Sequence, residues 1–165
     1  MLLIRAKMKK LPVRHSPVHL PPRGLGVRPV IIFLTVCTKE KKQILARREI
    51  HELLRDVWKE TEGWLVGRYV IMPDHVHLFC APRGEDVPSL EEWVRFWKAR
   101  ATRRWPYPEE RPLWQRSFWD TQLRRLDKYD EKWDYVRYNP VRKGLVQDPE
   151  EWPYQGVMNV LSWDG

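Results

Sequence analysis

The sequence predicts an α+β protein with a ferredoxin-like, split βαβ arrangement, in which an antiparallel sheet has helices on one face. The first observation is the length of 165 residues, which suits one domain with its own core. The second is the order of apolar periodicities along the chain, which predicts strand, helix, two strands, helix, strand and helix. Two of these helices connect strands, so they are expected to cross one face and to leave the other for a ligand.

The first half of the chain contains the most regular patterns. A run rich in β-branched residues at 29–38 predicts a buried strand, and apolar residues at helical spacing over 47–62 predict an amphipathic helix. Residues 65–81 predict two short strands around a Pro-Asp turn. Ser89-Leu-Glu-Glu92 is a capping box, and it predicts the start of a second helix with basic flanks.

The second half predicts a further strand, a helix and a tail. Residues 113–119 are strand-like, and Asp127 is the expected N-cap of a third helix that extends through Tyr138. The tail at 149–165 contains Trp and Tyr residues and is expected to pack back on the body of the domain.

An excess of basic residues favours a polyanionic partner. The chain has 30 Lys and Arg against 22 Asp and Glu, a formal net charge of +8, so nucleic acid is the first expectation. Residues 1–28 form a basic, proline-rich arm that touches a polyanion, wraps the domain at 29–165, or is a poorly ordered leader. The 10 Trp residues are either core and rim residues or stacking surfaces for bases.

Cysteine usage and hydropathy indicate the compartment. Cys37 and Cys80 lie in apolar runs and form no CxxC motif, which is typical of buried thiols in a reducing environment. No apolar run approaches the roughly 20 residues of a membrane helix. We therefore expect a cytoplasmic, nucleoid-associated protein without a membrane partner.

His75 and His77 are the first candidate site residues. Alternate side chains of a strand share a face, so both imidazoles are expected on one side, opposite Val76 and Leu78. Two neutral imidazoles side by side can hold a divalent metal. Spacing alone leaves the alternative open that they are two half-buried surface histidines in a hairpin.

The third helix supplies the other candidates. Tyr129, Trp133 and Val136 share one stripe, the expected core face, and Tyr135 lies nearly opposite. The residue before a proline avoids the helical backbone, so Asn139 is expected to interrupt the helix and to aim its amide away from it. Hard cations such as Mg²⁺ or Mn²⁺ accept an amide oxygen as ligand. The alternative for Tyr135 is a rim tyrosine that packs on the tail.

Three segments resemble the single-tyrosine HUH transposases and, within that family, the REP-associated tyrosine transposases. They are Tyr69-Val-Ile-Met-Pro-Asp-His-Val-His-Leu78, Trp114-Gln-Arg-Ser-Phe-Trp-Asp120 and Tyr135-Val-Arg-Tyr-Asn-Pro-Val-Arg-Lys-Gly-Leu145. They follow the family's order within residues 29–146, which is more specific than a His-x-His motif alone.

The resemblance implies an HUH domain with a divalent metal, Mg²⁺ or Mn²⁺, on His75 and His77. It also implies that Tyr135 is a nucleophile that cleaves single-stranded DNA, holds a 5′-phosphotyrosine intermediate and frees a 3′-hydroxyl. The implied third ligand is Asn139, although related transposases often have Gln at this position. The REP-associated branch acts on palindromic hairpins in bacterial genomes.

Single-stranded or hairpin DNA is expected to lie across the basic second helix and a second basic group, because counterion release dominates such binding. The residues expected to contact it are Arg95, Lys98, Arg100, Arg103, Arg104, Arg116, Arg124, Arg125, Arg142 and Lys143. Both a monomer and a homodimer are compatible with the sequence.

Two other functions were compared with this one. A catalytically inactive DNA- or RNA-binding module of the same fold would not need His75, His77 and Tyr135 together. A histidine-triad nucleotide hydrolase needs His-x-His-x-His, and the third position here is Phe79.

Overall fold

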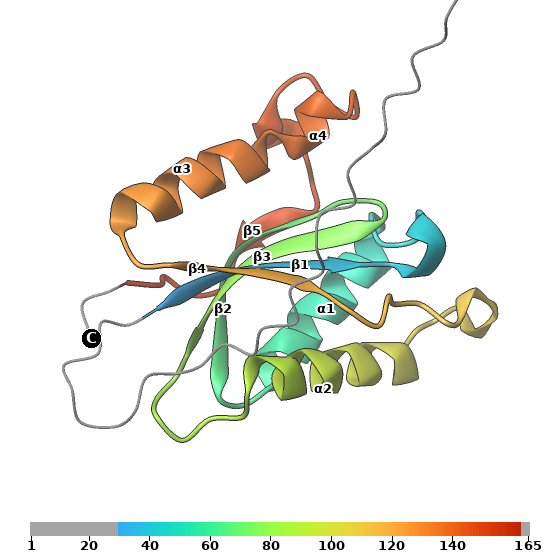
Figure 1. Cartoon of the computed structure of the whole chain (residues 1–165). Coiled ribbons are helices and arrows are strands. Elements are labelled where there is room, and N and C mark those ends of the chain that lie inside the picture. Colours follow the sequence, from blue (N-terminus) through green and yellow to red (C-terminus); the bar gives the residue numbers. More distant parts are fainter. Residues whose placement is uncertain (1–29, 163–165) are drawn as a thin grey trace, which may run out of the picture.

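Five antiparallel strands form one sheet in the order β4-β1-β3-β2-β5 in the computed structural model, which describes residues 30–162 (Figure 1). The basic arm at 1–28 lies outside the described residues. The strands are β1 (Ile31–Cys37), β2 (Trp64–Ile71), β3 (His75–Pro82), β4 (Trp119–Leu123) and β5 (Gln155–Val157). The helices are α1 (Arg48–Glu60), α2 (Leu90–Arg103), α3 (Leu126–Arg137) and α4 (Asn139–Arg142), with 3-10 turns at Lys39–Lys41, Pro108–Glu110 and Pro149–Glu151.

The helices α1 and α2 cover one face of the sheet, as the sequence predicts (Figure 1). Alternation places Leu34 of β1 and Leu78 of β3 on this face, where both are fully buried. Tryptophan rings fill the space between helices and sheet, with Trp58 of α1 against Trp97 of α2 at a centroid distance of 5.9 Å. Burial of these rings gives this face a dry core.

The helix α3 lies across the opposite face of the sheet (Figure 1). The expectation that this face is left to a ligand therefore holds only for the part that α3 does not cover. The reason is the apolar stripe of α3, which must be buried. Tyr129 packs edge-on against Phe79 of β3, at 4.7 Å between ring centroids, and Val136 is also buried.

Two predicted boundaries in the second half were wrong. The strand expected at 113–119 begins only at Trp119, and Trp114 forms an isolated bridge with Thr38. The Trp114 indole instead packs against Trp97 at 5.5 Å, so it serves the core beneath α2. Asp127 is not the N-cap of α3: the helix starts after Arg125, and the Asp127 carboxylate accepts hydrogen bonds within the first turn.

Other predicted elements are confirmed. The hairpin forms β2 and β3, and the Ser89 capping box is complete, with Glu92 returning a hydrogen bond to the Ser89 amide. The tail packs back on the body, because the buried Trp152 donates its indole N–H to the Ile71 carbonyl and β5 adds an unexpected edge strand to β2. None of the helices within residues 30–162 is long and apolar enough to cross a membrane.

Candidate active site

The two histidines of β3 converge as the sequence predicts. His75 and His77 both lie on the face of the sheet that α3 crosses, and their Nε2 atoms are 3.0 Å apart. The rings meet edge to face, at 4.6 Å between centroids. Strand alternation thus places both imidazoles on one face of the sheet.

The other ring nitrogen of each histidine is held by a neighbour. The Asp74 carboxylate accepts a hydrogen bond from His75 Nδ1 at 2.6 Å, which leaves the lone pair of this imidazole on Nε2. The Thr35 hydroxyl of β1 lies 2.9 Å from His77 Nδ1 and can accept from it in the same way. Phe33, two residues earlier on β1, stacks on the His77 ring. Such partners orient imidazoles in metal sites.

His77 is neutral at physiological pH. Burial lowers its pKa most, and together with the nearby charges of His75, Lys132 and Arg142 it brings the value from 6.5 to about 3. A neutral imidazole keeps a lone pair available as a ligand. The site therefore needs no deprotonation of His77 before it can bind a cation.

Asn139 reaches this pair from a distant part of the chain. The helix α3 ends at Arg137, and Asn139 begins α4 directly before Pro140, so the interruption predicted at this proline is present. Its amide Nδ2 lies 3.2 Å from His75 Nε2. Rotation of the Asn139 amide by a half-turn would bring Oδ1 to the position of Nδ2 near His75, since the C=O and NH₂ groups of an amide are nearly equal in size.

Tyr135 is exposed, with 65% of its surface accessible, and lies on the side of α3 away from the buried Tyr129 and Val136. The helical phase predicted from the sequence is thus confirmed. The Arg142 guanidinium lies 4.0 Å from the centroid of the Tyr135 ring and donates a hydrogen bond to the Tyr135 carbonyl. Because the same guanidinium also acts on the His77 pKa, it connects the tyrosine to the histidine pair.

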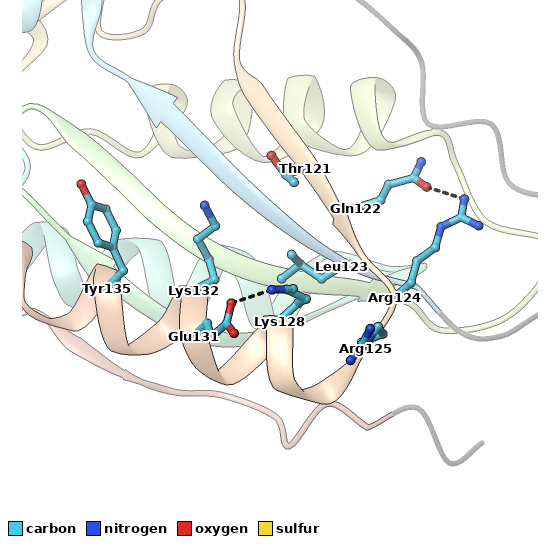
Figure 2. Close-up of a pocket in the computed structure, with 9 residues that line it drawn as sticks. All are labelled: Thr121, Gln122, Leu123, Arg124, Arg125, Lys128, Glu131, Lys132 and Tyr135. Carbon is cyan, nitrogen blue, oxygen red and sulfur yellow. Dashed lines mark hydrogen bonds and ion pairs between the residues drawn. The ribbon is translucent and has the colours of Figure 1, made fainter.

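A groove of about 540 Å³ runs between β4 and α3. Figure 2 shows its lining, in which Tyr135 and Lys132 project from α3 in the same direction. The lining residues are Thr121, Gln122, Leu123, Arg124, Arg125, Lys128, Glu131, Lys132 and Tyr135. The groove therefore extends from Arg124 and Arg125, which follow β4, to Tyr135.

Lys132 was missed by the sequence reasoning. Its ammonium lies 5.1 Å from the centroid of the Phe33 ring, which in turn stacks on His77. No carboxylate within residues 30–162 pairs with it, whereas Lys128, one turn earlier, is paired with Glu131. The signal was present in the sequence, because residues three apart share a side of a helix and Lys132 precedes Tyr135 by three.

The basic residues predicted to contact DNA fall on two sides of the sheet. Those of α2 are separated from the histidines by the sheet itself, and three of them have other partners. The partly buried Lys98 ammonium donates to the Gln115 carbonyl at 2.6 Å, and burial lowers its pKa to about 8. Arg100 and Arg104 both pair with Glu60.

The remaining α2 cations, Arg95 and Arg103, are exposed on that same helix, and Arg95 pairs with Glu91. On the other side, Arg124 and Arg125 line the groove and Arg142 lies at Tyr135. The exposed Arg116 and Lys143 belong to loop and helix-end segments. The groove side thus has the cations that share a surface with Tyr135.

Residues 27–125 match the family described as IS200-like transposases. This segment contains both histidines and ends just before α3. A candidate REP-associated tyrosine transposase of Haemophilus influenzae is 31% identical over 139 residues, which cover 75% of this chain and 77% of that protein. The REP-associated tyrosine transposase of Escherichia coli is 26% identical over 126 residues, which cover 74% and 73%.

Solved structures share the fold. A REP-associated tyrosine transposase bound to a REP hairpin has a TM-score of 0.65 and 22% identity, over 82% of this chain and 81% of that chain. A candidate transposase of Deinococcus radiodurans has a TM-score of 0.51 and 23% identity, over 70% and 95%. The chain therefore belongs to the IS200-like transposases, enzymes that cleave and join DNA, and among them to the REP-associated tyrosine transposases.

Proposed function

We propose that this transposase cleaves and rejoins single-stranded DNA beside a hairpin, with Tyr135 as nucleophile and a divalent metal, Mg²⁺ or Mn²⁺, on His75 and His77. One observation supports this most directly: the two Nε2 atoms meet at 3.0 Å while both Nδ1 atoms have neighbouring oxygens. Where both Nδ1 atoms carry the proton, the two Nε2 lone pairs face each other, and they repel unless a cation lies between them.

The donor set fits such an ion. Two ligands about 2.1 Å from an octahedral ion, in neighbouring positions, lie about 3.0 Å from each other. Within residues 30–162 no cluster of three or more His, Cys, Asp and Glu side chains is suited to a metal, so a third protein ligand has to be of another type. We propose Asn139 for this position, since its amide contacts His75 and would offer Oδ1 after a half-turn. The remaining positions would belong to water and to a phosphate oxygen, whose charge the bound ion would help to neutralise.

The covalent step proposed for Tyr135 conserves the number of phosphodiester bonds. Its hydroxyl oxygen attacks the phosphorus, a Tyr–O–P bond forms, and the bond from phosphorus to the 3′-oxygen of the preceding nucleotide breaks. The phenolic proton leaves to solvent and the 3′-oxygen takes up a proton. A free 3′-hydroxyl can reverse the reaction without any energy source, which joins the strands.

The cations on the groove side favour the developing charge and the DNA backbone. Arg142 at the Tyr135 ring and Lys132 above Phe33 both lie close enough to the histidine pair to act on the His77 pKa. Arg124 and Arg125 extend the positive surface along the groove. The REP hairpin bound to the structural relative supports a hairpin as substrate here. Such a substrate would place the protein on chromosomal DNA in the cytoplasm, as a monomer or a homodimer.

The test uses two copies of one hairpin oligonucleotide with a single-stranded flank, labelled at either the 5′ or the 3′ end. In Mg²⁺ or Mn²⁺, the 3′-labelled strand should become attached to protein that resists denaturing detergent. The 5′-labelled strand should be released shortened, with a 3′-hydroxyl that a polymerase extends. Attachment of the 5′-labelled fragment would contradict the proposed polarity, and binding without any adduct would favour the inactive binding module.

A further inference from the structure

Trp119 is exposed on the face of the sheet that contains the histidines. It is the first residue of the edge strand β4, and 44% of its surface is accessible. Among residues 30–162 it is the only exposed tryptophan, since the others are buried or half-buried in the cores. An indole combines a broad flat ring with a polar N–H, so one that is exposed next to the proposed reaction site is available for stacking with a ligand.

The strand register places Trp119 in line with the histidine pair. Trp119 is paired with Thr35 of β1, and Thr35 is paired with His77 of β3. Residues paired across antiparallel strands point to the same face, so the three side chains form one row. Two strand spacings separate the backbones of Trp119 and His77, which amounts to about 10 Å.

The same face of β4 also forms a wall of the groove. Thr121 and Leu123 alternate with Trp119 along the strand, and both line the groove that ends at Tyr135. A strand of DNA in this groove with its phosphate at the histidines and Tyr135 would therefore pass the Trp119 indole. The cations of the groove could follow the phosphate backbone of the DNA, and the Trp119 ring could stack on a base. Proteins that bind single-stranded nucleic acid combine these two features.

We propose that Trp119 is a stacking platform for the base of a nucleotide next to the cleaved phosphate. This inference rests on the proposed function, because it takes the histidine pair as the place of the phosphate. Trp119 touches the substrate but takes no part in the bond exchange. Stacking of this kind tolerates different bases, so Trp119 fixes the position of the strand more than its sequence.

The experiment measures binding of the Tyr135→Phe protein to the hairpin oligonucleotide, so that cleavage does not interfere. Adding Trp119→Ala should weaken binding about 5- to 150-fold, whereas Trp119→Phe should keep most of the affinity. The matched control is Phe96→Ala, which removes an aromatic ring of 51% exposure on α2, on the far face of the sheet. It should leave binding unchanged, and thermal unfolding should show that each variant is folded.

A set of abasic oligonucleotides identifies the base involved. One abasic position in the flank should weaken binding to the Trp119-containing protein as much as Trp119→Ala does, and should cause no further loss in Trp119→Ala. Two results would overturn the inference. One is equal binding by the Trp119→Ala protein and its parent. The other is that every abasic position weakens binding to the Trp119→Ala protein as much as it weakens binding to the parent. If the protein with Tyr135 intact forms the adduct in these cases, the proposed function stands without this inference. If the protein with Tyr135 intact neither binds nor cleaves the oligonucleotide, both the inference and the proposed function fail.

Discussion

The two faces of this sheet are made by the same strands but differ in every other respect. On the α1–α2 face, Leu34 and Leu78 are buried in a core that also contains closely packed tryptophan rings. One residue along each strand, on the α3 face, Thr35 and His77 form a hydrogen bond beside an open groove. Because neighbouring residues of a strand face opposite sides of the sheet, a residue of the core is followed directly by a residue of the candidate site.

The dry face is held by packing more than by polar contacts. Four indole N–H groups on this side have no acceptor in the described part of the chain, those of Trp58, Trp93, Trp97 and Trp114. The α3 face has a small apolar core under the helix, and beside it lie oriented imidazoles, cations and an exposed tyrosine. We therefore expect substitutions in the α1–α2 core to lower the free energy of unfolding. Substitutions of the candidate site residues should abolish activity in a protein that still folds.

The largest effect is expected from Tyr135→Phe, which removes only a hydroxyl from an exposed ring. Strand cleavage and the covalent adduct should both vanish, because no other group replaces the nucleophile. The urea midpoint and DNA affinity should change little. Tyr138→Phe is the control, since Tyr138 is a second exposed tyrosine one turn on, and it should still form the adduct. The opposite pattern would mean that Tyr138 is the nucleophile.

Next in size is His77→Ala, which removes one of the two converging nitrogens. Cleavage should again be lost, together with most of the rise in melting temperature that Mn²⁺ gives the parent protein. His51→Ala is the matched control, because His51 lies on α1 and its ring contacts the Tyr69 hydroxyl. That variant should keep the Mn²⁺ effect, and an unchanged Mn²⁺ effect in His77→Ala would exclude the proposed ligand.

On the dry face, Trp97→Ala should lower the free energy of unfolding by about 3–5 kcal/mol, since it empties the space of a fully buried ring. Urea denaturation measures this directly. The adjacent Phe96 is half-exposed on the same helix, and Phe96→Ala should cost less than about 1 kcal/mol. Equal losses for the two would show that the tryptophan contacts do not dominate this core.

The smallest of these effects concerns Lys132→Gln. Removing an unpaired charge near the histidines should slow cleavage about tenfold, an amount typical of a single electrostatic contact of about 1.4 kcal/mol. Lys132→Arg should restore part of the rate. Lys128→Gln, whose charge is already paired with Glu131, should change it less than about twofold. A larger loss in Lys128→Gln would point to general attraction of DNA instead of a local role for Lys132.

The sequence by itself determined what depends on local periodicity. The shared face of His75 and His77 followed from strand alternation, and the outward position of Tyr135 followed from helical phase; both are present in the structure. The Ser89 capping box and the interruption before Pro140 are also local features, set by a few neighbouring backbone groups. The motifs around these residues were sufficient to indicate the family.

Only the tertiary structure decided which distant groups meet. Asn139 reaches His75 across 64 residues, and Thr35 reaches His77 across 42, because chain crossings and strand pairing bring them together. The placement of α3 on the face opposite α1 and α2 divided the predicted basic residues into two sides, which no local period encodes. The edge strand predicted at 113–119 lies at 119–123 in the structure. The reason is that its position depends on pairing with β1 and not on the propensity of the segment alone.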